Sequence, residues 1–242
     1  MKNITSLVAV VFTVLALAGC SEKDLRQAYE IITDSTEDVP LTKTEVAAAL
    51  KDSLSQGISK GALIASARDG YYGNPRLKIE FPPEVSKVEE ALRKIGLGND
   101  VDRFVKQLNR GAEKAATKAK PIFIKAITSM TIQDAFEILN GADDAATQYL
   151  VRTTGGELRR QFLPIVSDTL QQTKATRYYG DIVNKYNQLP LVDDVDPDLE
   201  SYATDRAIAG LFVLIADEEG RIRANPAART TELLRRVFGS LD

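Results

Sequence analysis

The chain has 242 residues, a formal net charge of −3, one cysteine and no histidine. Without histidine it lacks the commonest general base and the usual metal ligand, and a single cysteine excludes an internal disulfide. Together these two features argue against a structural zinc site, and the acidic charge balance disfavours nucleic-acid binding. The length suits one domain, or one domain with an appendage.

Residues 1–19 have the features of a secretory signal peptide. Lys2 supplies the positive charge, and the apolar run 7–17 is too short for a permanent transmembrane helix. The run ends in Leu17-Ala18-Gly19-Cys20, which resembles a bacterial lipobox, where the signal is cleaved before the cysteine and the thiol is lipidated. We therefore expect Cys20 to hold the mature chain on a membrane through its acyl chains.

The residues after Cys20 predict where the anchored chain lies. Ser21 rather than aspartate follows the cysteine, which in Gram-negative bacteria favours the outer membrane, with the chain facing the periplasm. Residues 20–40 form the lipidated N-terminus and a mostly polar tether, whose reach is roughly 25 Å if it is flexible. Residues 41–242 are expected to form one helical domain.

The first part of this domain predicts one long helix and the only convincing strand. Thr42-x-x-Glu45 is a capping box that opens the helix, and Gly57 and Gly61 either break it or crowd it against a neighbour. Further on, apolar residues alternate with charged ones at 77–81, which is the period of a half-buried strand. That strand either pairs with residues 71–72 in a small hairpin or lies extended across helices.

The next stretch predicts two helices and a restart. Apolar positions indicate a helix over 85–95, closed by Gly96. Asn99 or Asp100 caps a long helix, and Pro121 kinks or restarts it. The apolar stripe of the long helix consists of Val101, Phe104, Val105, Leu108, Ala112, Ala115, Ala116 and Ala119.

The segment 131–172 is expected to form the packed centre as three successive helices. The first ends at Asn140-Gly141, where a left-handed C-cap is expected, and Asp143 or Asp144 starts the second. Thr154-x-x-Glu157 reads as a capping box that opens the third, in which Pro164 predicts a kink.

The C-terminal part predicts three more helices. One covers 178–187, a second starts at Asp196-Pro197 and ends at Gly220, and the last covers 225–239. Gly210 on the apolar side of the second indicates close contact with another helix. The fold class is therefore all-α, an irregular multi-helix bundle with at most one short β-hairpin near residues 71–81.

Four phrases together resemble a known bacterial family, the domain of unknown function 4197. They are NRGAEKAATKA (109–119), MTIQDAFEILNGADDAATQYL (130–150), YATDRAIAGLF (202–212) and IRANPAARTTELLRRVFG (222–239). The resemblance covers nearly all of the chain from residue 41 onward. It implies a mostly helical exported protein, often a lipoprotein, and it implies no activity.

An acidic loop offers Asp194, Asp196 and Asp198 as oxygen ligands for calcium. The pattern departs from an EF-hand, because Leu199 stands where glycine is needed and Asp205 replaces the bidentate glutamate. A solvated loop that favours the N-terminus of the following helix explains the same residues, and no metal is predicted.

A basic ridge follows the long central helix at i, i+4 spacing, formed by Lys106, Arg110, Lys114 and Lys118. The favoured interpretation is a solvated face with acidic neighbours from other helices. The alternative is contact with anionic lipid headgroups.

Catalysis has little support in the sequence. Glu113, Asp134, Asp143 and Asp144 are candidates for a carboxylate pair, but capping and helix-border positions explain all four. No nucleophile or phosphate-loop motif is present. We therefore expect an anchored envelope protein that is not an enzyme, needs no cofactor and binds an envelope protein or the membrane. The alternatives are a carrier of an apolar or lipid ligand and an enzyme that uses carboxylates.

Overall fold

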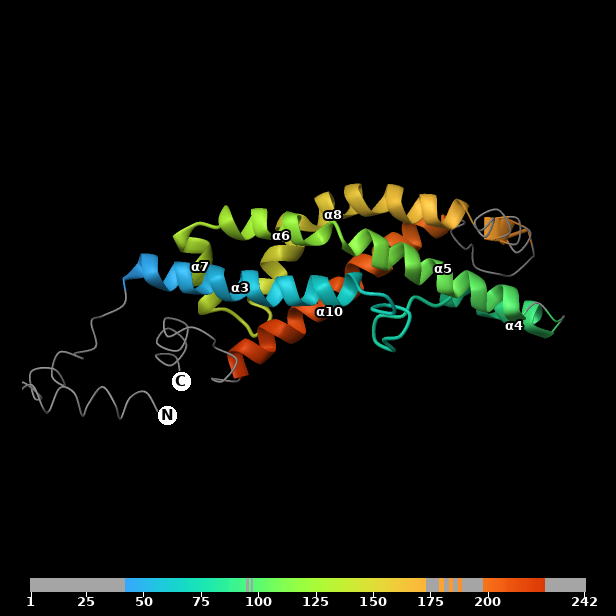
Figure 1. Ribbon diagram of the computed structural model, residues 1–242, viewed down its shortest axis with the longest axis horizontal. Coiled ribbons are helices and arrows are strands. Elements are labelled where there is room, and N and C mark those ends of the chain that lie inside the picture. Colours follow the sequence, from blue (N-terminus) through green and yellow to red (C-terminus); the bar gives the residue numbers. More distant parts are fainter. Residues whose placement is uncertain are drawn as a thin grey trace, which may run out of the picture. The chain divides into compact units, whose positions relative to one another are not determined.

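A computed structural model of the chain describes residues 42–94, 96, 98–172, 179–180, 183–184, 187–188 and 198–224. These residues form only helices, turns and irregular segments, so the all-α prediction is confirmed (Figure 1). The elements are α3 (Lys43–Ser66), the 3-10 helix η1 (Pro83–Val85), α4 (Ser86–Lys94), α5 (Gly98–Ala116), α6 (Ala119–Thr128), α7 (Ile132–Leu139), α8 (Ala145–Gln171) and α10 (Leu199–Ala224).

The core lies where α8 packs against both α5 and α10, while α3 packs against α10, α6 and α7 (Figure 1). The predicted apolar stripe of α5 is buried along its whole length, as the helical period requires. Other large side chains that are fully buried include Ile58, Phe123, Leu150, Phe162, Leu170 and Leu211. Burial of this apolar surface is the main favourable contribution to folding.

The segment 131–172 forms two helices where three were predicted. α7 begins after Thr131, as expected, but α8 then runs without a break from Ala145 to Gln171. Thr154 does not cap a new helix, because its buried hydroxyl donates to the carbonyl oxygen of Leu150 one turn earlier at 2.5 Å. Pro164 lies inside the same helix. The prediction that a third helix begins at Thr154 was therefore wrong.

The two glycines of α3 crowd the helix rather than break it. A Cβ at Gly57 would meet Glu218 at 3.4 Å, and a Cβ at Gly61 would meet Leu214 at 3.6 Å, so both glycines face α10. Gly210 was predicted to contact another helix closely, and the structure differs. A Cβ there would lie 2.9 Å from Tyr71, which belongs to an irregular segment and not to a helix.

Several helix ends follow their sequence signals and others do not. Gly96, with a φ of 90°, follows the end of α4, and Pro121 lies in the first turn of the new helix α6. Asn140 closes α7 with a φ of −91°, so the left-handed cap expected there does not form. α5 begins at Gly98, before the predicted caps. α10 begins at Leu199 and continues past Gly220 to Ala224, later at both ends than predicted.

The predicted strand does not form in the described residues. Residues 67–82, called the 67–82 segment below, link α3 to η1 through turns and extended backbone. Of the alternating apolar residues, Leu77 and Ile79 are buried and Phe81 is half-buried, so the predicted half-buried pattern is kept without a strand. Tyr71 is buried as well.

Other predicted parts lie outside the described residues. These are the signal peptide, Cys20, the tether, the helix at 225–239 and half of the helix at 178–187. Within the last of these, Tyr179 and Val183 are helical and buried.

Candidate functional site

The guanidinium of Arg110 joins α5 to the 67–82 segment. It donates to Asp69 Oδ1 at 2.7 Å and pairs with Glu113 one turn further along α5. Asp69 has a φ of 67°, in the left-handed region. The hydrogen bond from Arg110 lowers the pKa of the Asp69 carboxyl below its usual value. Arg110 therefore acts as a structural tie.

The other basic residues of the predicted ridge have different surroundings. Lys114 lies 3.3 Å from the carboxylate of Asp168 in α8. The ammonium of Lys106 lies 6.0 Å from the centre of the Tyr72 ring, a cation–π distance. Lys118 is exposed just before α6. Among the described residues, neither Lys106 nor Lys118 has an ion-pair partner within 4 Å.

Glu113 is buried and accepts hydrogen bonds from the 67–82 segment. Its Oε1 accepts from the backbone N–H groups of Tyr71 and Tyr72, each at 3.2 Å, and Oε2 accepts from Arg110. Tyr71 is also fixed at its other end, because its hydroxyl donates to the carbonyl oxygen of Ala207 at 2.6 Å. Burial and the nearby negative charge of Glu113 raise the pKa of the Tyr71 hydroxyl. Both oxygens of Glu113 thus have structural partners.

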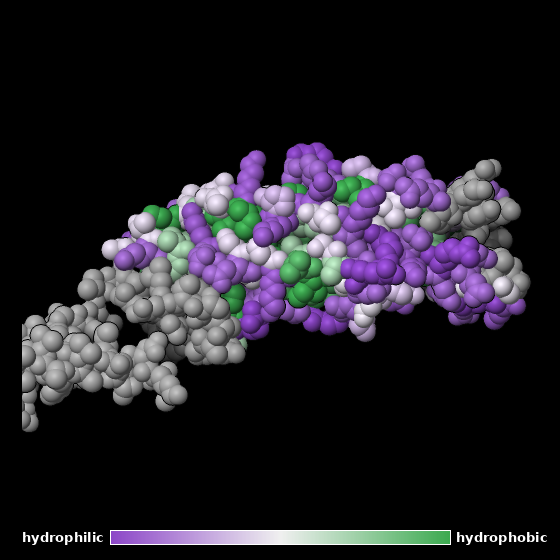
Figure 2. Space-filling model, viewed as in Figure 1, coloured by the Kyte–Doolittle hydropathy of each residue, from purple (hydrophilic) through white to green (hydrophobic). Residues whose placement is uncertain are grey.

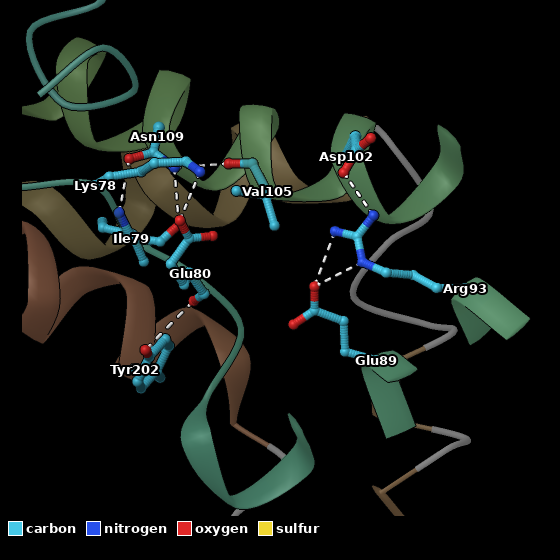
Figure 3. A network of polar contacts seen from close by, with 9 residues as sticks. All are labelled: Lys78, Ile79, Glu80, Glu89, Arg93, Asp102, Val105, Asn109 and Tyr202. Atoms are coloured by element: carbon cyan, nitrogen blue, oxygen red, sulfur yellow. Dashed lines mark hydrogen bonds and ion pairs between the residues drawn. The ribbon is translucent and has the colours of Figure 1, made fainter. Parts of the chain in front are cut away.

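Asn109 makes the backbone contacts that a neighbouring strand would otherwise make (Figure 3). Its Oδ1 accepts from the N–H of Ile79 at 2.8 Å, and its Nδ2 donates to the carbonyl oxygen of Ile79 at 2.8 Å. The same amide group donates to Val105 within α5 at 2.7 Å. A buried side chain therefore satisfies both polar groups of a buried backbone residue.

The same segment contacts α10 on its other side. Arg76 forms a two-pronged pair with Asp217, at 2.7 and 3.0 Å. The hydroxyl of Tyr202 donates to the carbonyl oxygen of Glu80 at 3.3 Å (Figure 3). Arg93, in the same view, pairs with Glu89 of its own helix and with Asp102 of α5. These contacts bind the 67–82 segment and α4 to the helices around them.

The candidate catalytic carboxylates other than Glu113 have separate partners. Asp134 completes a capping box with Thr131 at the start of α7, and hydrogen bonds from Thr131 lower the pKa of its carboxyl. Asp144 is the N-cap residue of α8, as predicted, but its side chain makes no capping hydrogen bond. Asp143 is exposed.

The cap of α8 comes instead from Glu219, which sequence reasoning missed. This buried carboxylate of α10 accepts from the N–H groups of Ala146 at 2.9 Å and Thr147 at 2.8 Å. Arg223 bonds to the same carboxylate and to the carbonyl oxygen of Ile138 in α7. A signal was present, since Glu218 and Glu219 fall between apolar positions at helical spacing, where an acid needs a partner.

The calcium candidates are only partly described. Asp194 and Asp196 lie outside the described residues, while Asp198 accepts from the backbone and hydroxyl of Ser201 at 2.9 and 2.6 Å. These bonds cap α10 and lower the pKa of the Asp198 carboxyl. Within the described ranges, no three histidine, cysteine or acidic side chains gather as a metal site would require.

None of the described helices combines the length and the apolar character that a membrane-spanning helix needs.

Comparison with known proteins places the chain in a family. No curated protein and no solved structure matches it significantly. A family model does match, over residues 40–239, which is most of the chain and all of the described core. The chain therefore belongs to the family described as Protein of unknown function (DUF4197).

Proposed function

We propose that the mature protein is a lipid-anchored envelope module that acts by binding, with its helical domain held near the outer membrane on the periplasmic side. The observation that carries this proposal is the run Leu17-Ala18-Gly19-Cys20 after an apolar signal segment. Two or more acyl chains on Cys20 anchor a protein stably, whereas one chain binds only marginally. The polar tether after Cys20 separates the anchor from the domain.

Binding is favoured over catalysis by how the buried acids are used. Glu113 and Glu219 accept backbone N–H groups and pair with arginines, so their oxygens serve the fold. Glu218 pairs with Lys60 at 2.8 Å and with Arg221. Groups held in this way are poor general acids or bases, because a proton transfer would break their structural contacts.

The anchoring is tested by membrane fractionation of cells that produce the full-length chain, together with labelling by a radioactive fatty acid. Wild type is expected in the outer-membrane fraction with label incorporated. Cys20→Ser is expected to lose the label and to leave that fraction. Ser21→Asp, which keeps the cysteine, is expected to retain the label and to move toward the inner membrane.

The two variants separate anchoring from sorting. Label and membrane association that survive in Cys20→Ser would overturn the proposed anchor. An unchanged distribution of Ser21→Asp would leave the anchor intact and overturn only the outer-membrane assignment.

A further inference from the structure

The C-terminal end of α3 presents two large apolar side chains to solvent. Leu63 is 71% exposed and Ile64 is 39% exposed, although the neighbouring Ala62 and Ala65 are buried. A single exposed leucine is ordinary, but two adjacent ones form a small apolar projection. Figure 2 shows an apolar area bordered by hydrophilic residues on the face of the domain that carries α3.

A cationic side chain, Arg68, follows four residues after Ile64. The N–H of Ala67 donates to the carbonyl oxygens of Leu63 and Ile64 at 3.1 and 3.3 Å, so both residues belong to the last turn of α3, and the N–H of Gly70 donates to the carbonyl oxygen of Ala67 at 3.0 Å in the turn that follows. Arg68 is exposed. Within the described part of the chain, Arg68 has no ion-pair partner inside 4 Å.

α5 brings a second cation to the same place. The pair between Asp69 and Arg110 holds α5 against the residues that follow α3. Lys106 lies one turn before Arg110 on the same side of α5, and its positive charge acts on Asp69. Arg110 is neutralised by its acidic partners, so the charge available for binding comes from Lys106 and Arg68.

An aromatic ring, that of Tyr72, lies beside Lys106. Tyr72 is half-buried, and the charged groups of Lys78, Lys106 and Arg110 lie 5.7, 6.0 and 5.7 Å from its ring centre. Residues 63–72 thus carry exposed apolar side chains, a cation and an aromatic ring, and Lys106 lies beside that ring. Such a combination is typical of surfaces that bind at the membrane–water boundary.

We propose that Leu63, Ile64, Arg68, Tyr72 and Lys106 form a contact face that docks on an anionic lipid leaflet. Leu63 and Ile64 enter the headgroup region, while Arg68 and Lys106 bind the lipid phosphates. The proposal rests on the proposed function, which places the domain beside a membrane.

Each residue of the contact face contributes only weakly to lipid binding, but the anchor on Cys20 keeps the domain close to the leaflet. Basic residues near an anionic surface each strengthen binding by roughly fivefold, and two partly exposed aliphatic side chains add a limited apolar contribution. A tether of about 20 residues keeps the local lipid concentration high, so a weak face is sufficient for docking.

Docking is measured without the anchor, on the mature chain (residues 20–242) carrying Cys20→Ser. The chain has one cysteine, so this background is free of thiols and a new one can be labelled at a single site. A polarity-sensitive fluorophore on Leu63→Cys is expected to shift to the blue when vesicles containing phosphatidylglycerol are added. The same fluorophore on Val151→Cys, a residue 41% exposed on α8, is the matched control and is expected not to shift.

Co-sedimentation with the same vesicles tests the charges. Arg68→Glu with Lys106→Glu is expected to weaken binding at low salt more than tenfold, and Leu63→Ser with Ile64→Ser to weaken it several-fold. Lys87→Glu on α4 is the control for charge reversal at an exposed lysine and is expected to have little effect. Thermal unfolding of each variant checks that the fold is kept.

Absence of wild-type binding at low salt would overturn the contact face, as would equal binding to phosphatidylcholine vesicles or an equal loss in Lys87→Glu. Binding that depends on Lys114 and Lys118 but not on Arg68 and Lys106 would overturn it too. Because this chain carries no acyl group, the result is independent of the fractionation of Cys20→Ser, and failure of the anchor is distinguished from failure of the face.

Discussion

At the scale of single residues, the fold depends on polar side chains that replace regular backbone pairing. Asn109 satisfies both backbone groups of Ile79, Glu113 receives two N–H groups of the 67–82 segment, and Glu219 caps α8 from another helix. Each such hydrogen bond contributes little net free energy to folding, but its removal leaves a buried polar group without a partner and lowers stability much more.

We expect Asn109→Ala to lower the free energy of unfolding by about 2–4 kcal/mol, because the N–H and carbonyl of Ile79 would each remain buried without their partner. Urea unfolding followed by circular dichroism measures this difference. Gln107→Ala, on the same helix and less buried, is the control and should change stability by about 0.5 kcal/mol or less. Equal values for the two variants would show that Asn109 does not hold the 67–82 segment.

At the scale of the elements, replacing a helical glycine by alanine can raise or lower stability, depending on what the added Cβ would contact. Gly155 and Gly156 lie in the interior of α8, where an added Cβ would meet nothing within 4 Å. At Gly210 of α10 an added Cβ would lie 2.9 Å from Tyr71, whose ring is buried and whose hydroxyl is bonded to Ala207. Local helix propensity favours alanine at all three positions, and packing opposes it only at the last.

Gly155→Ala and Gly156→Ala should each raise the stability of the protein by about 0.5–1 kcal/mol, since alanine restricts the unfolded chain and favours the helix. Gly210→Ala should lower stability by about 1–2 kcal/mol, because the overpacking against Tyr71 exceeds the helix gain. Thermal melts of the three variants give the comparison. A stabilised Gly210→Ala would show that Tyr71 moves aside easily.

At the scale of the whole molecule, the helices depend on contacts between distant parts of the chain. α10 packs against α3, α5 and α8, supplies the acceptor at the start of α8 and holds the 67–82 segment through Asp217 and Tyr202. Without α10, the helices before it therefore lack an apolar partner, and α8 lacks the acceptor at its first turn.

A chain ending at residue 198 is expected to lose cooperative unfolding, because removal of α10 exposes the buried faces of α3 and α8 to water. The near-ultraviolet circular dichroism of its tyrosines should collapse, while part of the helical signal at shorter wavelength remains. A sharp thermal transition in this shortened chain would show that the earlier helices form a domain by themselves.

The sequence by itself determined the all-α class, the start of α7 and the buried stripe of α5. These features depend on local periodicity and on residues close in the chain. The same is true of two helix boundaries, at Gly96 after α4 and at Pro121 in the first turn of α6. The four quoted phrases also pointed to the family that the chain belongs to.

Only the tertiary structure decided where local signals yield to packing. The Thr154 box did not start a helix, because a continuous α8 buries its apolar residues against α5 and α10 and pairs the Thr154 hydroxyl internally. The alternation at 77–81 did not make a strand, because Asn109 of α5 took the place of a strand partner. Both outcomes depend on residues from distant elements, and a pattern within one segment holds no information about those partners.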